Sequence, residues 1–319
     1  MRRLTAVLAA ACTILAVAVV PARAAGAGAT IVSENWLTPN REVDVQLHSA
    51  DTQVPIKSVR LLLPSGWTPG ATRTWPTLWL LHGGLDDYTS WTDPDNTDIV
   101  ARSLNHQAIV VMPDTSWCSE YSDWVSGPRW ETYLTQDVDA VLRAHYHAGT
   151  ARSVAGNSMG GLGAMYLTEH NPGFFRAAAS LSGELNPSHS NPAYDPGDRD
   201  QPGLPCTLNE EDVWGTPGGS LWNQHDPALN TQKLAGVRLF FSSGVDPQDT
   251  SGTFPSTCTG TDLIEEGTCR ETQAMLDSLR RAGIGYTYRP VPGGHHQWSG
   301  NWASELDQAL GMLYGAIGA

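Results

Sequence analysis

The sequence predicts an α/β fold in which a mostly parallel sheet is covered by helices on both faces. Short apolar runs alternate with segments of helical periodicity along the chain. Such alternation favours parallel strands joined by helices. An earlier segment, residues 41–63, shows alternating residues broken by Pro55 and predicts an antiparallel hairpin ahead of the parallel strands.

Four short apolar runs are typical of buried strands, and four longer segments are typical of helices. The strands are expected at residues 78–81, 108–112, 177–181 and 237–241. The helices are expected at residues 131–146, 160–170, 271–282 and 302–314, with stop signals at Asn171-Pro172 and Gly283. An antiparallel start followed by a doubly wound parallel sheet is the arrangement of α/β-hydrolases.

The N-terminus has the features of a signal peptide. Two arginines precede an apolar run at residues 4–20, and an A-x-A cleavage site ends at Ala24. A retained membrane anchor is the alternative, but the run is slightly short for a span and small residues follow it at once. We therefore expect residues 1–24 to be removed by cleavage near Ala24. Residues 25–319 are expected to form a single catalytic domain that is secreted.

The charge balance argues against nucleic acid or anionic membranes as partners. The net charge is −14, and loss of the signal peptide removes three arginines and no acid, which gives −17. This balance is normal for a secreted enzyme, and we expect a monomer without a stable membrane anchor.

The cysteines predict disulfides. After Cys12 leaves with the signal peptide, Cys118, Cys206, Cys258 and Cys269 remain. An even number in an oxidising compartment favours two bridges. Cys258 and Cys269 would close a short loop, and Cys118 and Cys206 would then pair across the fold. Neither spacing is typical of a zinc site, so no metal and no cofactor are expected.

The stretch Gly-Asn-Ser-Met-Gly-Gly at residues 156–161 contains the motif G-x-S-x-G around Ser158. In an α/β sheet this motif forms a sharp strand-to-helix turn that lifts a serine hydroxyl above the strands. The preceding residues 153–155 are a poor strand by propensity, so the turn glycines define the motif more than the strand does. Alone, the motif is weak, because 32 glycines make a chance occurrence common.

A nucleophilic serine needs a base and an acid that orients the base, and α/β-hydrolases place these after the serine in the order acid, then histidine. Two histidines, His295 and His296, follow Pro-Gly-Gly shortly before the last predicted helix. The acid is expected after the strand at residues 237–241, where Asp246 stands, and a pair at Glu265 and Glu266 lies further on, inside the expected Cys258–Cys269 loop. By position alone, Asp246 is the choice.

An oxyanion hole needs backbone N–H groups close to the serine. The sequence His82-Gly83-Gly84 directly follows the strand at residues 78–81. One donor is expected from Gly84, or from Leu85, and the other from Met159, the residue after the nucleophile.

Several segments together resemble the mycolyltransferase (antigen 85) family and the related esterase-D-type esterases. They are LLHGGLDDYTSW at 80–91, YSDW at 121–124 with WET at 130–132, GNSMG at 156–160, DVWG at 212–215 and HQW at 296–298. The resemblance extends from about residue 41 to residue 310. It implies that His296, in the family's His-x-Trp motif, is the base. The family acid is a glutamate about ten residues before an apolar helix position, which implies Glu265 by counting back from Met275, with Asp246 as the rival.

The chain also departs from the mycolyltransferases. These carry an acidic residue where His82 stands and an arginine in the oxyanion loop that helps to hold trehalose, whereas residues 78–100 contain no arginine. Tryptophans near the motifs, Trp298 and Trp91 foremost, suit either an acyl chain or a sugar face.

The sequence therefore predicts a secreted serine esterase or acyltransferase that acts on a small-molecule, lipid or sugar ester. Transfer of an acyl group to a sugar of the cell envelope, as in the mycolyltransferases, is the alternative. A non-catalytic sugar-binding protein or adhesin is a third hypothesis, which predicts a broken triad. A Pro/Gly-rich stretch at residues 186–205 is long for a loop and is typical of a lid.

Overall fold

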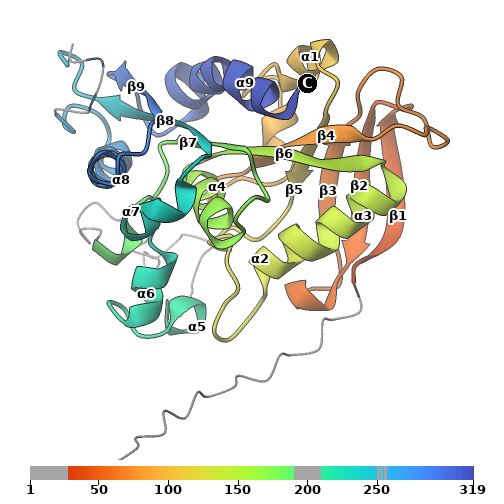
Figure 1. Ribbon diagram of the computed structural model, residues 1–319, viewed down its shortest axis with the longest axis horizontal. Helices are drawn as coiled ribbons and strands as arrows, with labels where there is room; N and C mark the ends of the chain where they lie inside the picture. Colours follow the sequence, from red (N-terminus) through yellow and green to blue (C-terminus); the bar gives the residue numbers. More distant parts are fainter. Residues whose placement is uncertain (1–27, 190–209, 250–251, 253, 255–256) are drawn as a thin grey trace, which may run out of the picture.

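The computed structural model describes residues 28–189, 210–249, 252, 254 and 257–319 (Figure 1). Nine strands form one mixed sheet. In order across the sheet they are β1 (Thr30–Thr38), β2 (Glu42–His48), β3 (Lys57–Leu62), β5 (Ile109–Pro113), β4 (Trp75–Leu81), β6 (Ala148–Asn157), β7 (Ala177–Leu181), β8 (Arg238–Val245) and β9 (Thr287–Pro292). The pairs from β1 to β5 are antiparallel, and the pairs from β5 to β9 are parallel. The predicted α/β-hydrolase fold is confirmed.

The helices lie on both faces of this sheet. They are α1 (Ile99–Arg102), α2 (Trp130–Thr132), α3 (Asp139–His145), α4 (Met159–His170), α5 (Glu210–Trp214), α6 (Ser220–His225), α7 (Pro227–Asn230), α8 (Leu263–Ala282) and α9 (Ala303–Ile317). A π-helical segment, η4 (Tyr133–Val138), joins α2 to α3. The segment η7 (Trp298–Trp302) precedes α9, and its backbone is kinked and non-helical at Ser299 and Gly300. Short 3-10 turns lie at Ala50–Thr52, Ser90–Thr92, Ser103–Asn105, Pro187–His189 and Thr231–Leu234.

Alternation along the central strands explains the two layers of helices. In β4, Trp79 and Leu81 point to one core, which α4 and α8 cover, whereas Leu78 and Leu80 point to the other, which α9 covers. Side chains of a strand alternate between the faces of its sheet, so a strand that is apolar at every position is buried on both sides. Figure 1 shows α9 and α1 on one side of the sheet and α2, α3 and α4 on the other.

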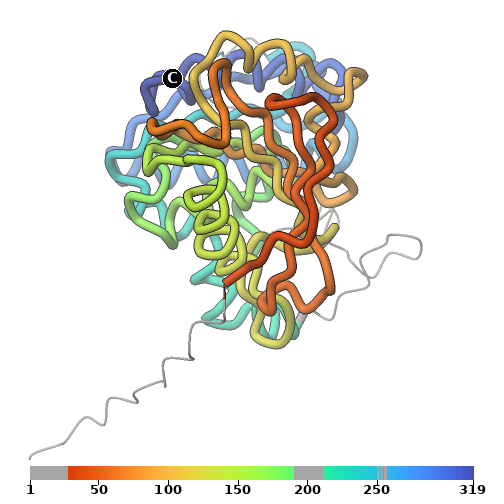
Figure 2. Tube along the Cα trace, turned by 90° about the vertical axis from the view of Figure 1, so that its right-hand side faces the viewer, coloured from red at the N-terminus to blue at the C-terminus, as the bar shows by residue number. Residues whose placement is uncertain are grey.

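The N-terminal strands form the predicted antiparallel start. β2 pairs with β3 so that Val45 lies opposite Val59, and Pro55 lies between the two strands. A further strand, β1, adds to the outside of this hairpin. Figure 2 shows these strands in red and orange along one side of the molecule.

At three places the sequence pattern and the structure differ. The segment at residues 153–155 lies in the middle of a ten-residue strand, because β6 is central and pairs with both β4 and β7. β9 was not expected, since this edge strand contains two prolines. The helix expected at residues 271–282 begins at Leu263, where the Asp262 side chain accepts the Glu265 N–H and caps the helix.

Several expectations fall on parts of the chain outside the described residues. These are the signal peptide at residues 1–24, most of the lid segment at 186–205, and Cys206. Cys118, its expected partner, is disulfide-bonded. Within the described ranges, none of the helices is both long and apolar enough to cross a membrane.

Candidate active site

The candidate site lies at the edge of the sheet where the parallel strands end. β6 ends directly before Ser158, and β4 ends directly before His82. β7 ends before Ser182, and β9 ends four residues before His296. Because the carboxyl ends of parallel strands meet at one edge, side chains that are far apart in sequence come together there.

Ser158 sits on a strained turn between β6 and α4. Its φ of 53° and ψ of −125° belong to a conformation that non-glycine residues rarely adopt. A Cβ atom at Gly156 would run into the backbone of Gly160, and one at Gly160 would run into the carbonyl oxygen of Leu81. Glycine at both positions thus permits the sharp turn that presents the Ser158 hydroxyl.

Three predicted side chains form one hydrogen-bonded series. The Ser158 Oγ lies 2.9 Å from His296 Nε2, and His296 Nδ1 lies 2.8 Å from Glu265 Oε2. Glu265 is fully buried, and the His296 side chain is 9% exposed. A carboxylate at Nδ1 favours the tautomer in which that nitrogen carries the proton, which leaves Nε2 free to accept the serine proton.

The second oxygen of Glu265 is held by donors from three segments. Its Oε1 accepts a hydrogen bond of 2.7 Å from the Ser182 hydroxyl, one of 3.2 Å from the Asn301 amide and a short one from the Gly244 N–H. Since every polar neighbour of this carboxylate donates, the ionised form is the one that satisfies them. Burial of a charged group is tolerated when hydrogen bonds satisfy it, as they do here.

Asn301 connects the acid to the loop that carries the base. The two hydrogens of its fully buried side-chain amide are shared among three acceptors: the Ser182 hydroxyl at 3.1 Å, the His295 carbonyl at 2.9 Å and the Glu265 carboxylate. The carbonyl belongs to the residue directly before His296, so Asn301 restrains the base and the acid together.

Asp262 restrains the same two residues from the other side. Its carboxylate accepts the backbone N–H of Glu265 at 2.9 Å and that of His296 at 2.8 Å, and the His295 ring lies 3.2 Å away. Burial raises the pKa of Asp262, but the hydrogen bonds from His296 and Glu265 outweigh it, so that the pKa is lowered below its ordinary value.

Asp246, the rival for the acid, has different contacts. Its carboxylate accepts the Gln248 N–H at 2.7 Å and the Thr259 hydroxyl at 3.3 Å, as an aspartate in a turn does.

Glu265 lies between the two bridged cysteines, as expected, but it belongs to the first turn of α8 and not to an irregular loop. The expected Cys258–Cys269 bridge is present and ties the segment before α8 to that helix, with the Cα atoms 5.6 Å apart.

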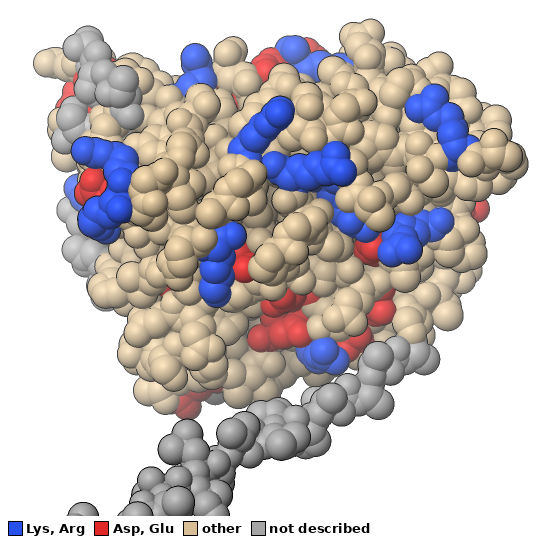
Figure 3. Space-filling view, viewed as in Figure 1, with Lys and Arg blue, Asp and Glu red and all other residues tan. Residues whose placement is uncertain are grey.

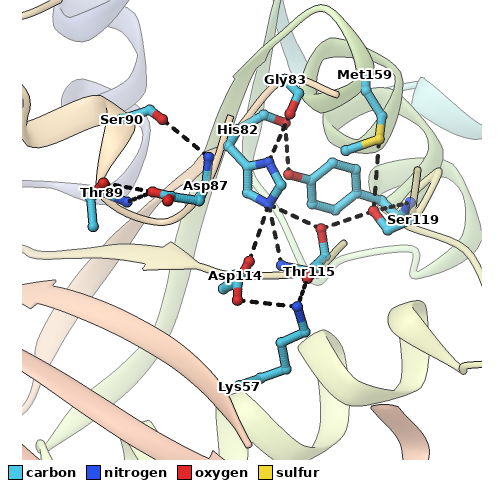
Figure 4. A network of polar contacts seen from close by, with 11 residues as sticks. Lys57, His82, Gly83, Asp87, Thr89, Ser90, Asp114, Thr115, Ser119 and Met159 are labelled. Carbon is cyan, nitrogen blue, oxygen red and sulfur yellow. Dashed lines mark hydrogen bonds and ion pairs between the residues drawn. The ribbon is translucent and has the colours of Figure 1, made fainter. Parts of the chain in front are cut away.

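The segments that carry the two expected oxyanion donors lie next to Ser158. Gly83 packs so closely that a Cβ atom there would lie 3.5 Å from the Ser158 Cβ, which places the Gly83-Gly84 segment beside the nucleophile. Met159 is the first residue of α4, where a helix leaves its N–H groups without partners inside the helix. Figure 4 shows the His82-Gly83 segment and Met159 from close by.

The tryptophans form an aromatic group next to the base. Trp302 meets the His296 ring edge to face with centroids 4.8 Å apart, and Trp298 meets Trp302 at 5.5 Å. Trp91 packs against Trp298 at 4.8 Å, but its side chain is completely buried. Trp91 therefore has no exposed surface of its own to offer a substrate, whereas Trp298 is partly exposed.

Sequence reasoning missed three residues at this site: Asp262, Ser182 and Asn301. Asp262 had a usable signal, because an aspartate three residues before a glutamate is a helix-start pattern. Ser182 and Asn301 had none, since they lie 83 and 36 residues away from Glu265 in the chain.

Charged side chains are spread over the face of the molecule that Figure 3 shows. Figure 3 shows lysine and arginine side chains dispersed among uncharged residues and acids on the face seen in Figure 1. Among the described residues, no group of three or more His, Cys, Asp or Glu side chains could hold a metal ion.

Comparison with known proteins finds a matching family and several relatives. The family model described as "Putative esterase" matches residues 49–313. The chain is 27% identical to the diacylglycerol acyltransferase/mycolyltransferase Ag85A of Mycobacterium tuberculosis, over 84% of this chain and 81% of that one. It is 31% identical to an esterase of the same species over 80% of this chain, and the match spans 58% of the relative's length.

Solved structures show the same fold. An S-formylglutathione hydrolase from Agrobacterium tumefaciens superposes with a TM-score of 0.66 at 17% identity, covering 90% of this chain and 99% of the other. A fluorophosphonate-binding serine hydrolase of Staphylococcus aureus, FphF, superposes with a TM-score of 0.65 at 20% identity, covering 88% and 99%.

Proposed function

The chain belongs to this esterase family, and from that membership we propose that it is a secreted serine esterase or acyltransferase. In this proposal Ser158 is the nucleophile, His296 the general base and Glu265 the residue that orients the base. The observation that carries it is the continuous series of hydrogen bonds from Ser158 through His296 to Glu265. Gly84 and Met159 supply the oxyanion donors.

The first half of the reaction forms an acyl-enzyme. The Ser158 Oγ attacks the ester carbonyl carbon while its proton passes to His296 Nε2, 2.9 Å away. The carbonyl oxygen becomes an oxyanion, which accepts hydrogen bonds from the Gly84 and Met159 N–H groups. The tetrahedral intermediate then collapses, and the leaving alcohol takes the proton from His296 as its bond to carbon breaks.

The second half returns the enzyme to its starting state. Water, or the hydroxyl of an acceptor alcohol, gives its proton to His296 Nε2 and attacks the acyl carbon. Collapse of this second intermediate releases the acid or the new ester, and the proton returns to Ser158. Through both halves Glu265 remains ionised and stabilises the imidazolium at a distance of 2.8 Å.

Hydrolysis and acyl transfer differ only in the acceptor. A relative that covers most of the chain is named an acyltransferase, which supports transfer as the alternative. The missing arginine in residues 78–100 argues against a trehalose acceptor held in the mycolyltransferase manner. The intact hydrogen-bonded series weighs against the third hypothesis, a non-catalytic protein on this fold. The Cys258–Cys269 disulfide supports secretion, because such bonds persist in oxidising compartments.

Turnover of p-nitrophenyl esters of increasing chain length, with and without sugar acceptors, tests the proposal. Wild-type protein is compared with Ser158→Ala and with Ser220→Ala, a control at an exposed serine at the start of α6. We expect loss of turnover in Ser158→Ala alone. Unchanged turnover in that variant would refute the nucleophile. A product ester that appears only with a sugar present would identify acyl transfer.

A further inference from the structure

A buried histidine, His82, lies next to the proposed oxyanion loop and takes no part in the series from Ser158 to Glu265. Its side chain is 1% exposed. In Figure 4 its ring lies between the Gly83 carbonyl on one side and Thr115 and Asp114 on the other. The Nδ1 atom lies 2.8 Å from the Gly83 carbonyl oxygen, and the Nε2 atom lies 3.2 Å from the Thr115 backbone nitrogen.

These two backbone groups fix the protonation of the ring. The Thr115 N–H can only donate, so Nε2 must accept and carries no proton. The Gly83 carbonyl can only accept, so Nδ1 must carry the proton. His82 is therefore a neutral imidazole of defined tautomer. Complete burial lowers the pKa of His82, which agrees with the neutral form.

The hydrogen bond to Gly83 has a consequence for Gly84. The Gly83 carbonyl and the Gly84 N–H belong to one peptide group, which is planar and trans, since the described residues contain no cis peptide bond. In a trans peptide these two bonds point in opposite directions. The Gly83 carbonyl oxygen also accepts the Asp86 N–H at 3.2 Å. The His82 ring, at 2.8 Å, makes the shorter of the two bonds, and by holding this oxygen it also restrains the direction in which the Gly84 N–H points.

Neighbouring residues hold His82 itself and the other expected donor. The Tyr121 hydroxyl donates to the His82 carbonyl at 2.8 Å, and its ring packs against Gly163 in α4. The Ser119 hydroxyl donates to the Thr115 hydroxyl at 2.9 Å and lies 3.9 Å from the Met159 sulfur. One polar network thus contacts both segments that carry the expected oxyanion donors (Figure 4).

We propose that His82 is a positioning residue that aims the Gly84 N–H at the oxyanion by holding the Gly83 carbonyl. The inference rests on the function proposed above. It assigns the ring no proton transfer, because both ring nitrogens are occupied by backbone groups and the side chain is closed off from substrate. What it supplies is preorganisation, which an oxyanion hole requires because its donors must be in place before charge develops.

A matched pair of substitutions separates this role from packing. In His82→Asn the amide nitrogen can take the place of Nδ1 and still donate to Gly83. In His82→Gln the side-chain amide reaches the Nε2 position, and the bond to Gly83 is lost. We expect kcat for a p-nitrophenyl ester to fall roughly 10- to 100-fold in the Gln variant, less than the 10²- to 10³-fold typical of a deleted donor, and to stay within a few-fold of wild type in the Asn variant.

The pH profile of kcat/KM and the value of KM should not change in either variant, because His296 and ground-state binding are untouched. Tyr121→Phe, which keeps the ring against Gly163 but releases the His82 carbonyl, should lower kcat in the same direction by a smaller factor; thermal melting confirms that each variant folds. Equal loss in the Asn and Gln variants, or no loss in either, would overturn the role of His82 while leaving the esterase intact. No ester turnover in the wild type would overturn the proposed function, and this inference with it.

Discussion

The Asp262 carboxylate accepts the backbone N–H of His296 at 2.8 Å, although the two residues lie 34 positions apart in the chain. The same carboxylate caps the helix that carries Glu265. One side chain therefore sets the spacing between the proposed base and the proposed acid. A small shift of the Asp262 side chain would displace the base relative to the acid, and a small displacement of a catalytic group can cost much of the rate.

Asp262→Asn should impair catalysis more than folding. Asparagine still caps α8 through its oxygen, but its amide group would then face the His296 N–H, donor against donor. We expect kcat to fall about 10-fold or more, with a loss of stability below about 1 kcal/mol. Asp226→Asn is the control, because Asp226 caps α7, which contributes no residue to the site. Equal kcat in the two variants would contradict the role of Asp262.

Glu265→Gln and Asp246→Asn distinguish the two candidates for the acid. Glutamine would place an amide among the donors that surround Oε1 and would favour the wrong tautomer of His296. A loss in kcat of about 10³- to 10⁴-fold is expected for Glu265→Gln. Asp246→Asn should stay within a few-fold of wild type, since Asp246 shapes a turn. A large loss in the Asp246 variant alone would reverse the assignment.

Gly160→Ala should prevent the strand-to-helix turn from forming. The added methyl group would collide with the carbonyl oxygen of Leu81, a backbone atom in the central strand β4 that cannot move aside cheaply. We expect destabilisation by about 3 kcal/mol or more in a denaturant titration. The matched control is Gly311→Ala in α9, where the new methyl group would have no neighbour within 4 Å. That variant should gain about 0.5–1 kcal/mol, and similar losses in the two would be evidence against a steric need at Gly160.

His170 should make stability depend on pH. Burial, together with Lys233 and His225, lowers the pKa of His170 from 6.5 to about 4. As the pH falls from 6.5 towards 4, the unfolded chain takes up a proton at this residue that the folded chain does not, so the free energy of unfolding decreases. His170→Gln can keep the donor to the Gln224 carbonyl and removes the titration. Over this range the stability of wild type should fall more steeply than that of the variant, and parallel curves would contradict the shift.

The sequence predicted the structure well at positions where the backbone geometry admits only a few residue types. The glycines around Ser158 and the apolar run at residues 78–81 in β4 predicted the turn and the centre of the sheet, because few other residues fit there. Helix α8 begins eight residues earlier than predicted, because the Asp262 cap starts it ahead of Gly267 and Thr268, which are weak helix formers. β9 was missed because its pairing with β8, rather than its own composition, makes it a strand.

Contacts between segments that are distant in the chain could not be predicted from the sequence. Trp91 is a predicted substrate contact, but its side chain is completely buried and packs against Trp298. Nothing near Ser182 or Asn301 in the chain indicates that both donate to Glu265. The roles of Ser158, His296, Glu265, Gly84 and Met159 remain predictions that now have a defined geometry.

The central claim is that Ser158 carries an acyl group during turnover. Wild-type protein mixed with p-nitrophenyl acetate, quenched in acid within the burst phase, digested and measured by mass spectrometry tests it most directly. We expect one acetyl group on the peptide that contains Ser158. Its occupancy should be higher in Glu265→Gln if that change slows deacylation more than acylation. Steady ester turnover with no acetyl group on that peptide, or with the group on another residue, would contradict it.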